Sequence, residues 1–139
     1  MTTLTGDAAY LASLLGTISG PIVLVGHSYG GAVTSNAAAG NEQVQALVFC
    51  EVMAATQRPW SGAGYATPSG PPGWRSIPSW YLVGTEDRAI PPAGQRFMAE
   101  RANATIEEVP ASHASMVSQP EAVTRLILRA VEATAAAGP

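Results

Sequence analysis

The sequence predicts a single α/β domain in which about four parallel strands carry helices on both faces. Short, continuously apolar runs alternate with longer segments whose apolar residues recur at helical spacing, as they do when helices connect parallel strands. The chain has 139 residues, of which 47% are hydrophobic, which is enough for one buried core and too little for two. We therefore expect one domain over residues 1–139.

The first two elements are a helix and a buried strand. Apolar residues recur every three or four positions over residues 6–18, with Thr5 as the expected N-cap and Asp7 in the first turn. Four branched apolar residues, Ile22 to Val25, then lie between turn-forming Gly20-Pro21 and Gly26. Such a run is typical of a strand that is covered on both faces.

The strand ends in the motif G-x-S-x-G, formed by Gly26, Ser28 and Gly30. This motif favours a sharp strand-to-helix turn from which the serine hydroxyl projects, with glycine on both sides because a Cβ atom there would collide with its neighbours. A helix is expected over residues 29–39, with Gly40 at its C-cap. The motif alone fits a tight turn with a structural serine equally well.

A second strand is predicted over Ala46 to Cys50, which gives a parallel strand-helix-strand unit. Residues 52–78 are then interrupted by glycine and proline, and we expect a long loop that carries Trp60, Tyr65 and Trp74. These aromatic residues fit two interpretations, an apolar wall of a flap over a pocket and anchors that fix the loop to the core.

The last elements are two strands and two helices. Trp80 to Val83 predicts the third strand, and Pro91-Pro92 opens a helix to about residue 101 with Phe97 and Met98 on its inner face. Thr105 to Val109 fits a short charged edge strand. Ser118 and Glu121 predict a capping box for a final helix with an apolar stripe, which comprises Val123, Leu126, Ile127, Ala130 and Val131.

Three residues with catalytic potential follow predicted strands in the order Ser28, Asp87, His113. Ligands bind at the carboxyl ends of parallel strands, and a serine hydroxyl needs an imidazole as base and an acid that orients the imidazole. The backbone N–H of Tyr29 begins a helix and is placed to stabilise an oxyanion.

Alternatives remain for two of these roles. Asp87 also fits a turn residue that caps residues 84–89, and Glu51 at the end of the second strand is a rival acid. His27, the other histidine, adjoins Ser28, and its side chain is expected to point elsewhere, which leaves His113 as the base.

Three segments, GPIVLVGHSYGGAV, IPSWYLVGTEDRAIPPAGQRFMAERANA and SHASMVSQPEAV, resemble the nucleophile, acid and histidine segments of serine α/β-hydrolases. The resemblance is strongest to small esterases related to plant methyl-ester esterases and hydroxynitrile lyases. It implies that Ser28 is the nucleophile, Asp87 the acid and His113 the base in the hydrolysis of small carboxylic esters through an acyl-enzyme, with no cofactor. The chain contains no lysine, the residue with which hydroxynitrile lyases handle cyanide.

The resemblance also implies that residues 52–78 stand in the place of a cap domain, and that four further strands of the family are missing, together with the His-Gly loop that supplies a second oxyanion donor. Loss of one such donor costs about a hundredfold to a thousandfold in turnover. The alternative function is therefore a catalytically impaired α/β-hydrolase fragment or scaffold that self-associates. Without an outer neighbour, the strand Ile22 to Val25 becomes an apolar edge, and we expect a homodimer through it.

Composition excludes several other classes. A net charge of −3 without a basic cluster argues against a nucleic-acid partner, and one cysteine, Cys50, gives neither an intrachain disulfide nor a cysteine metal site. We expect Cys50 to act as a small buried hydrophobe. The glycines at 26, 30 and 31 do not form G-x-G-x-x-G, which argues against dinucleotide binding. Neither a signal peptide nor a membrane-spanning run is evident, so a cytoplasmic location is expected.

Overall fold

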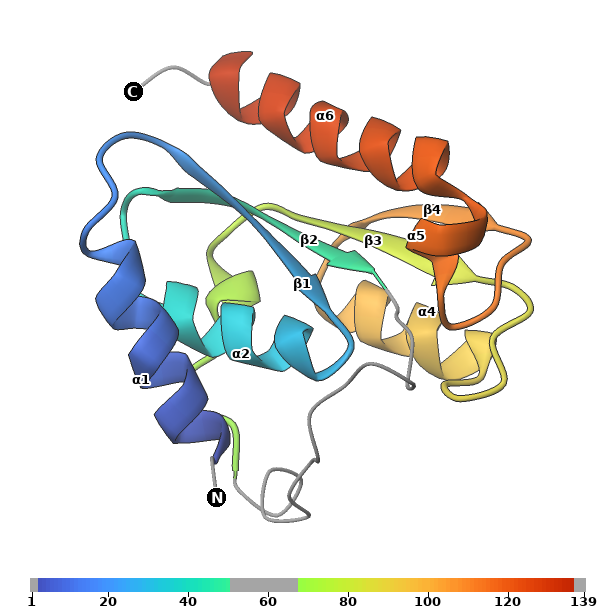
Figure 1. The fold of residues 1–139 in the computed structure, drawn as a ribbon, viewed down its shortest axis with the longest axis horizontal. Coiled ribbons are helices and arrows are strands. Elements are labelled where there is room, and N and C mark those ends of the chain that lie inside the picture. Colours follow the sequence, from blue (N-terminus) through green and yellow to red (C-terminus); the bar gives the residue numbers. More distant parts are fainter. Residues whose placement is uncertain (1–2, 51–67, 137–139) are drawn as a thin grey trace.

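A single parallel sheet forms the centre of the molecule. The computed structural model describes residues 3–50 and 68–136. Strands β1 (Ile22–His27), β2 (Val44–Cys50), β3 (Ser79–Gly84) and β4 (Thr105–Val109) lie side by side in this order, and each neighbouring pair is parallel (Figure 1). The predicted fold class is therefore confirmed. The carboxyl ends of all four strands meet at one edge of the sheet.

Helices cover both faces of the sheet (Figure 1). On one face lie α1 (Leu4–Leu15), α2 (Tyr29–Ala38) and α4 (Pro92–Arg101), and α6 (Pro120–Ala136) crosses the other. A short 3-10 helix, η1 (Gly73–Arg75), precedes β3, and a four-residue helix, α5 (Ser115–Ser118), precedes α6. Every connection between strands thus carries helical residues, as parallel pairing requires.

The side chains of β2 show why residues 46–50 form a continuous apolar run. Ala46, Val48 and Cys50 point to the α6 face, where they pack in one cluster with Leu126. Leu47 points to the opposite face and packs with Leu15 of α1. Since successive side chains of a strand face opposite sides, a sheet covered on both faces needs apolar residues at every position. Cys50 is 3% exposed, which confirms its prediction as a small buried residue.

Helix α1 begins and ends earlier than the sequence predicted. Thr3, not Thr5, is the N-cap, and its hydroxyl accepts a hydrogen bond from the Gly6 N–H at 3.1 Å. Ile18 consequently lies beyond the helix and is 42% exposed. Both threonines are suitable caps, so the sequence alone did not separate these two positions.

The inner face of α4 was also predicted wrongly. Phe97 and Met98 are 62% and 40% exposed, whereas Gln95 and Ala99 are fully buried. The expectation that the apolar residues of a helix face the core fails here. The helix buries Gln95 instead, because that side chain finds hydrogen-bond partners in the core, which are described below.

The final helix begins at Pro120, so Ser118 belongs to α5 and does not form the predicted capping box. Val131 of the predicted apolar stripe is 42% exposed, while Val123, Leu126 and Ala130 are buried as expected. The predicted charged edge strand is confirmed as β4, in which Glu108 pairs with Arg96 at 2.6 Å.

Part of the long loop predicted over residues 52–78 lies outside the described residues, as do Glu51, Trp60 and Tyr65. Within the described part, Trp74 belongs to η1 and packs against the cluster that contains Ala38 and Leu47. This contact supports the anchoring role for Trp74.

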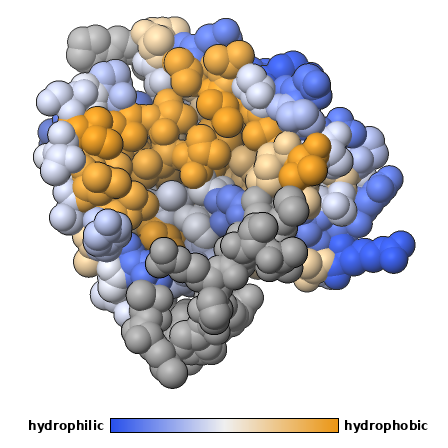
Figure 2. All heavy atoms as spheres, viewed as in Figure 1, coloured by the Kyte–Doolittle hydropathy of each residue, from blue (hydrophilic) through white to orange (hydrophobic). Residues whose placement is uncertain are grey.

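Strand β1 is an edge strand, with β2 as its one neighbour among the described residues. Its Val25 is 45% exposed. Figure 2 shows hydrophobic residues gathered on the face of the molecule on which β1 lies. In the described ranges, no helix is long and apolar enough to cross a membrane.

Candidate active site

Ser28 occupies a strained turn between β1 and α2. Its φ of 47° and ψ of −124° lie in a region that residues other than glycine rarely adopt, so the surrounding structure must hold it there. A Cβ atom at Gly26 would stand 2.7 Å from the Cα atom of Gly31 and would also collide with Thr34, so glycine is required at this position.

The second predicted collision, at Gly30, is wrong. A Cβ atom there would meet nothing within 4 Å, whereas one at Gly31 would lie 3.1 Å from the Phe49 ring. Contact with α2 therefore requires glycine at position 26, and packing against Phe49 of β2 favours glycine at position 31, whereas packing does not explain Gly30, the second glycine of the motif.

The Ser28 hydroxyl does not cap α2 and forms no hydrogen bond with a described residue. Tyr29, the first residue of α2, carries the N–H predicted to face an oxyanion. Its hydroxyl donates a hydrogen bond to the Asp7 carboxylate at 2.9 Å, and burial together with this bond raises the pKa of Tyr29. The contact ties the start of the elbow helix to α1.

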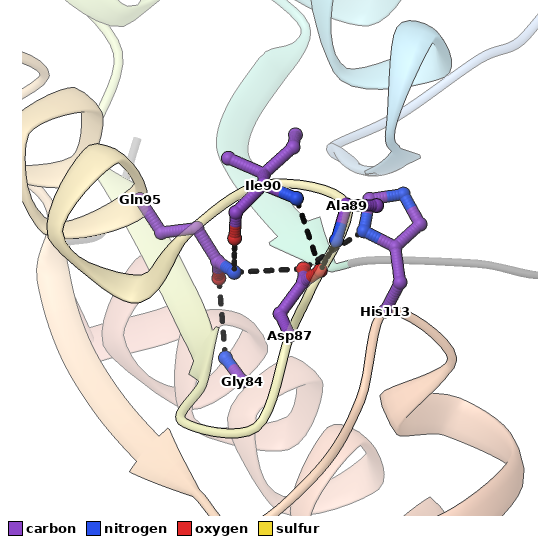
Figure 3. Close-up of polar contacts among 6 residues, drawn as sticks. All are labelled: Gly84, Asp87, Ala89, Ile90, Gln95 and His113. Carbon is purple, nitrogen blue, oxygen red and sulfur yellow. Dashed lines mark hydrogen bonds and ion pairs between the residues drawn. The ribbon is translucent and has the colours of Figure 1, made fainter.

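Asp87 lies in the loop after β3 and is 4% exposed (Figure 3). Its Oδ1 accepts hydrogen bonds from the backbone N–H groups of Ala89 and Ile90, at 2.7 and 3.0 Å. Its Oδ2 accepts one from the Gln95 amide at 2.8 Å and lies 2.8 Å from Nδ1 of His113. Burial alone would raise the pKa of Asp87, but the hydrogen bonds from His113, Ile90 and Ala89 outweigh it and lower that pKa.

His113 follows β4 and is oriented by this carboxylate. An ionised Asp87 accepts only, so Nδ1 of His113 is the donor of this hydrogen bond, and Nε2 is the other ring nitrogen, on the side away from Asp87. The loops after β3 and β4 are held together by backbone bonds from Thr85 to Val109 and from Glu86 to Ala111, at 2.9 and 3.1 Å. One oxygen of Asp87 thus closes its turn, and the other contacts His113.

Gln95 is a part of the site that the sequence analysis missed. It is fully buried, and its Nε2 donates to both Asp87 and the carbonyl of Ile90 at 2.8 Å, while its Oε1 accepts from the Gly84 N–H at 3.1 Å (Figure 3). The amide therefore joins the end of β3 to the acid. A glutamine in the first turn of a helix gives no pattern by which this role could be found.

His27 does not point away from the site as predicted. Its ring lies 6.1 Å from that of His113, centroid to centroid, in an edge-to-face arrangement with 80° between the planes. Burial, and in second place the nearby His113, lowers the pKa of His27 to about 4, so it is neutral at pH 7. Its Nε2 is buried and has no hydrogen-bond partner among the described residues.

The structure thus brings Asp87 and His113 into direct contact, and through His27 it places the His113 ring beside the elbow that carries Ser28. Ser28 and His113 are not hydrogen-bonded to each other in this arrangement. Such bonds are often formed only when substrate is present.

A groove of about 450 Å³ opens at Ser28. It runs between α2 and α4, and its apolar lining includes Phe49, Tyr81 and Met98. Another cavity, of about 660 Å³, lies near the amino ends of the strands beside Val44 and Trp80, and its lining contains none of the predicted catalytic residues. In the described part of the chain, no three His, Cys, Asp or Glu side chains are grouped so that they could hold a metal ion.

Comparison with known proteins places the chain in a family. The model of the alpha/beta hydrolase family matches residues 51–126, more than half of the chain, and this range includes Asp87 and His113. No curated protein matches the sequence.

Solved structures of similar fold cover nearly the whole chain. A pyrethroid hydrolase from Sphingobium faniae has a TM-score of 0.73 and 19% identity, over 98% of this chain and 79% of the other. A polyneuridine aldehyde esterase variant has a TM-score of 0.71 and 16% identity, over 93% and 80%. A putative non-heme bromoperoxidase from Mycobacterium tuberculosis has a TM-score of 0.69 and 17% identity, over 96% and 75%. These structures share the fold, and because the family model matches more than half of its residues, the chain belongs to the alpha/beta hydrolase family.

Proposed function

We propose that the protein is a serine hydrolase that cleaves small carboxylic esters through an acyl-enzyme intermediate. The observation that carries the proposal is the pair of Asp87 and His113, in which a buried carboxylate with four hydrogen-bond contacts orients a ring beside the elbow of Ser28. Membership of the alpha/beta hydrolase family and the esterase among its structural neighbours support the same chemistry.

In the proposed reaction, Oγ of Ser28 attacks the ester carbonyl carbon while its proton passes to Nε2 of His113. The backbone N–H of Tyr29 donates a hydrogen bond to the oxyanion that forms on the carbonyl oxygen. When the C–O bond to the alcohol breaks, Nε2 returns the proton to the leaving oxygen. A water molecule then attacks the acyl carbon and gives a proton to Nε2. Nε2 passes this proton to Oγ of Ser28 as the bond between the acyl carbon and Oγ breaks, which releases the carboxylic acid and restores the Ser28 hydroxyl.

Two charged or titratable groups lie next to His113. The ionised Asp87 lies 2.8 Å from Nδ1, where it would stabilise an imidazolium formed in the reaction. His27 is neutral because its pKa is about 4, so the ring packed against His113 adds no second positive charge.

A fluorophosphonate probe tests the proposal because it labels only serines activated for attack. We expect the wild-type protein to be labelled, Ser28→Ala to lose the label and Ser118→Ala, at an exposed position on α5, to keep it. p-Nitrophenyl acetate hydrolysis should follow the same order. Equal hydrolysis by wild type and Ser28→Ala would remove the basis of the proposal.

The alternative function, a self-associating scaffold with impaired catalysis, rests on a different observation. Among the described residues, β1 has an unpaired edge, and its apolar Val25 is 45% exposed. An edge of this kind pairs readily with another strand, and a two-fold contact closes without leaving a second adhesive surface. We propose a homodimer through β1 for both functions. A monodisperse monomer in light scattering at micromolar concentration would rule it out.

A further inference from the structure

The groove at Ser28 lies on one side of the proposed nucleophile. Its lining includes Ser28 and Gly26 but neither His113 nor Asp87. In the proposed function, on which this inference rests, the leaving alcohol must reach Nε2 of His113 to receive its proton. Since the groove starts at Ser28 and is not lined by His113, it lies on the side of Ser28 away from the leaving alcohol. We therefore expect it to hold the acyl part of the ester.

Two arginines of this groove are gathered at one aromatic ring. The guanidinium carbons of Arg75 and Arg101 lie 5.9 and 5.7 Å from the centre of the Trp74 indole, and all three residues line the groove. Cation–π contact holds these like charges against one ring.

Neither of the two arginines has a carboxylate partner in the part of the chain that the structure describes. Other arginines do have one: Arg96 pairs with Glu108, and Arg125 and Arg129 pair with Glu107. Within the described residues, the groove therefore carries positive charge that no acidic side chain neutralises.

We infer that the groove selects an acyl chain that ends in a carboxylate, so that the substrates are monoesters of dicarboxylic acids. A carboxylate matches the planar fork of a guanidinium, and two guanidinium groups at one ring supply the positive charge that it needs. The apolar side chains of Phe49 and Met98 line the groove for the methylene chain between the two ends. Its volume of about 450 Å³ is that of a small-molecule site.

The kinetic test compares two p-nitrophenyl esters of equal chain length, the monoester of adipic acid and the ester of hexanoic acid. We expect wild type to prefer the adipate monoester in kcat/KM, and the ratio of the two values to fall at least tenfold in the double variant Arg75→Gln, Arg101→Gln. Arg101→Lys, which keeps the charge, should retain part of the preference. Arg125→Gln on α6 removes the same charge outside the groove and should leave the ratio unchanged.

Binding of adipate itself separates this inference from the proposed function. By calorimetry, Ser28→Ala should bind adipate, and adding Arg75→Gln and Arg101→Gln should weaken binding at least tenfold. If no ester is hydrolysed and no probe reacts but adipate binds through the arginines, the proposed function fails and the carboxylate site stands. If both esters are hydrolysed equally well and adipate binding does not depend on the arginines, the carboxylate site is refuted and the hydrolase stands.

Discussion

Replacing Gln95 by leucine should destabilise the fold and impair catalysis together. The side chain is fully buried and makes three hydrogen bonds of 2.8 to 3.1 Å, to Asp87, Ile90 and Gly84. A hydrogen bond to an ionised group contributes about 1.5–3 kcal/mol, and each buried polar group left without a partner costs about 1–3 kcal/mol. Leucine would leave the Gly84 N–H without this acceptor and Asp87 with one donor fewer, so we expect a loss of about 3–6 kcal/mol in the free energy of unfolding. That is a large part of the roughly 5–15 kcal/mol typical of a domain.

The assay is urea unfolding followed by circular dichroism, with the midpoint and slope fitted for each variant. Gln119→Leu is the matched control, since its amide makes only one long bond of 3.5 Å, to the Pro110 carbonyl, at an exposed position. It should change the free energy of unfolding by less than about 0.5 kcal/mol. Because Gln95 orients Asp87, kcat for ester hydrolysis should also fall in Gln95→Leu molecules that remain folded.

A second variant, Gln95→Glu, keeps the shape of the side chain and replaces its donor by a carboxyl group. Two carboxyl groups at about this separation share a proton at neutral pH, so the charge that Asp87 offers to His113 is reduced and kcat should fall about tenfold or more. The reasoning is refuted if Gln95→Leu costs less than about 1 kcal/mol, or if both Gln95 variants retain wild-type kcat.

Four further outcomes are expected. Asp87→Asn should lower kcat by about 10³–10⁴-fold and leave KM nearly unchanged, because an amide does not stabilise the imidazolium of His113. A fall in kcat of less than tenfold in steady-state kinetics would contradict the proposed role of Asp87 as the acid. His27 has a pKa of about 4 in the folded protein against an ordinary value of 6.5, so between these pH values the unfolded chain binds more protons than the folded one. The free energy of unfolding should therefore fall by about 1–2 kcal/mol as the pH drops through this range, after allowance for partial exposure. In urea titrations at pH 7 and 4.5, His27→Gln should lose less stability than wild type, and an identical loss would be inconsistent with the lowered pKa. Gly26→Ala should lower the free energy of unfolding by about 3 kcal/mol, because its Cβ atom would collide with Gly31. Gly30→Ala, whose Cβ atom would meet nothing within 4 Å, should leave the free energy of unfolding unchanged or raise it by up to about 1 kcal/mol in thermal unfolding. Equal effects of the two variants would be evidence against the packing of the elbow. Val25→Arg at the exposed edge of β1 should convert the proposed dimer to a monomer in light scattering without loss of folding, and a dimer that survives it must use another surface.

The sequence predicted the sheet well because its evidence is repeated along the chain. β1, β2 and β3 each contain a short apolar run, as a sheet covered on both faces requires, and β4 has the charged residues expected of an edge strand. The elbow was predictable for a local reason, since Gly26 leaves room that no other residue would leave.

What the sequence did not predict depends on contacts between distant segments. Gln95 looks like any polar helix residue until β3 and the acid loop are placed around it. The side chain of His27 was expected to point away from the site, but packing turns it toward His113. Phe97 and Met98 were assigned to the core because they are apolar, although the helix presents Gln95 and Ala99 to the sheet.

Asp87 was ambiguous between a turn residue and a catalytic acid, and the ambiguity was real. Its pattern fits both roles, and its two oxygens serve both contacts. A sequence argument could not choose between the two roles, because the folded molecule contains the contacts that each of them requires.

The two oxygens of Asp87 bind different partners, Oδ1 the backbone of its own turn and Oδ2 the ring of His113, and this limits which mutations the protein can accept during evolution. A mutation that moves the carboxylate would break the hydrogen bonds from Ala89 and Ile90 as well as the contact with His113. The conformation of the loop and the orientation of the imidazole therefore depend on the same side chain. Directed evolution toward a new substrate should therefore accumulate changes in the groove between α2 and α4, and leave residues 84–90 almost untouched even under selection for altered activity.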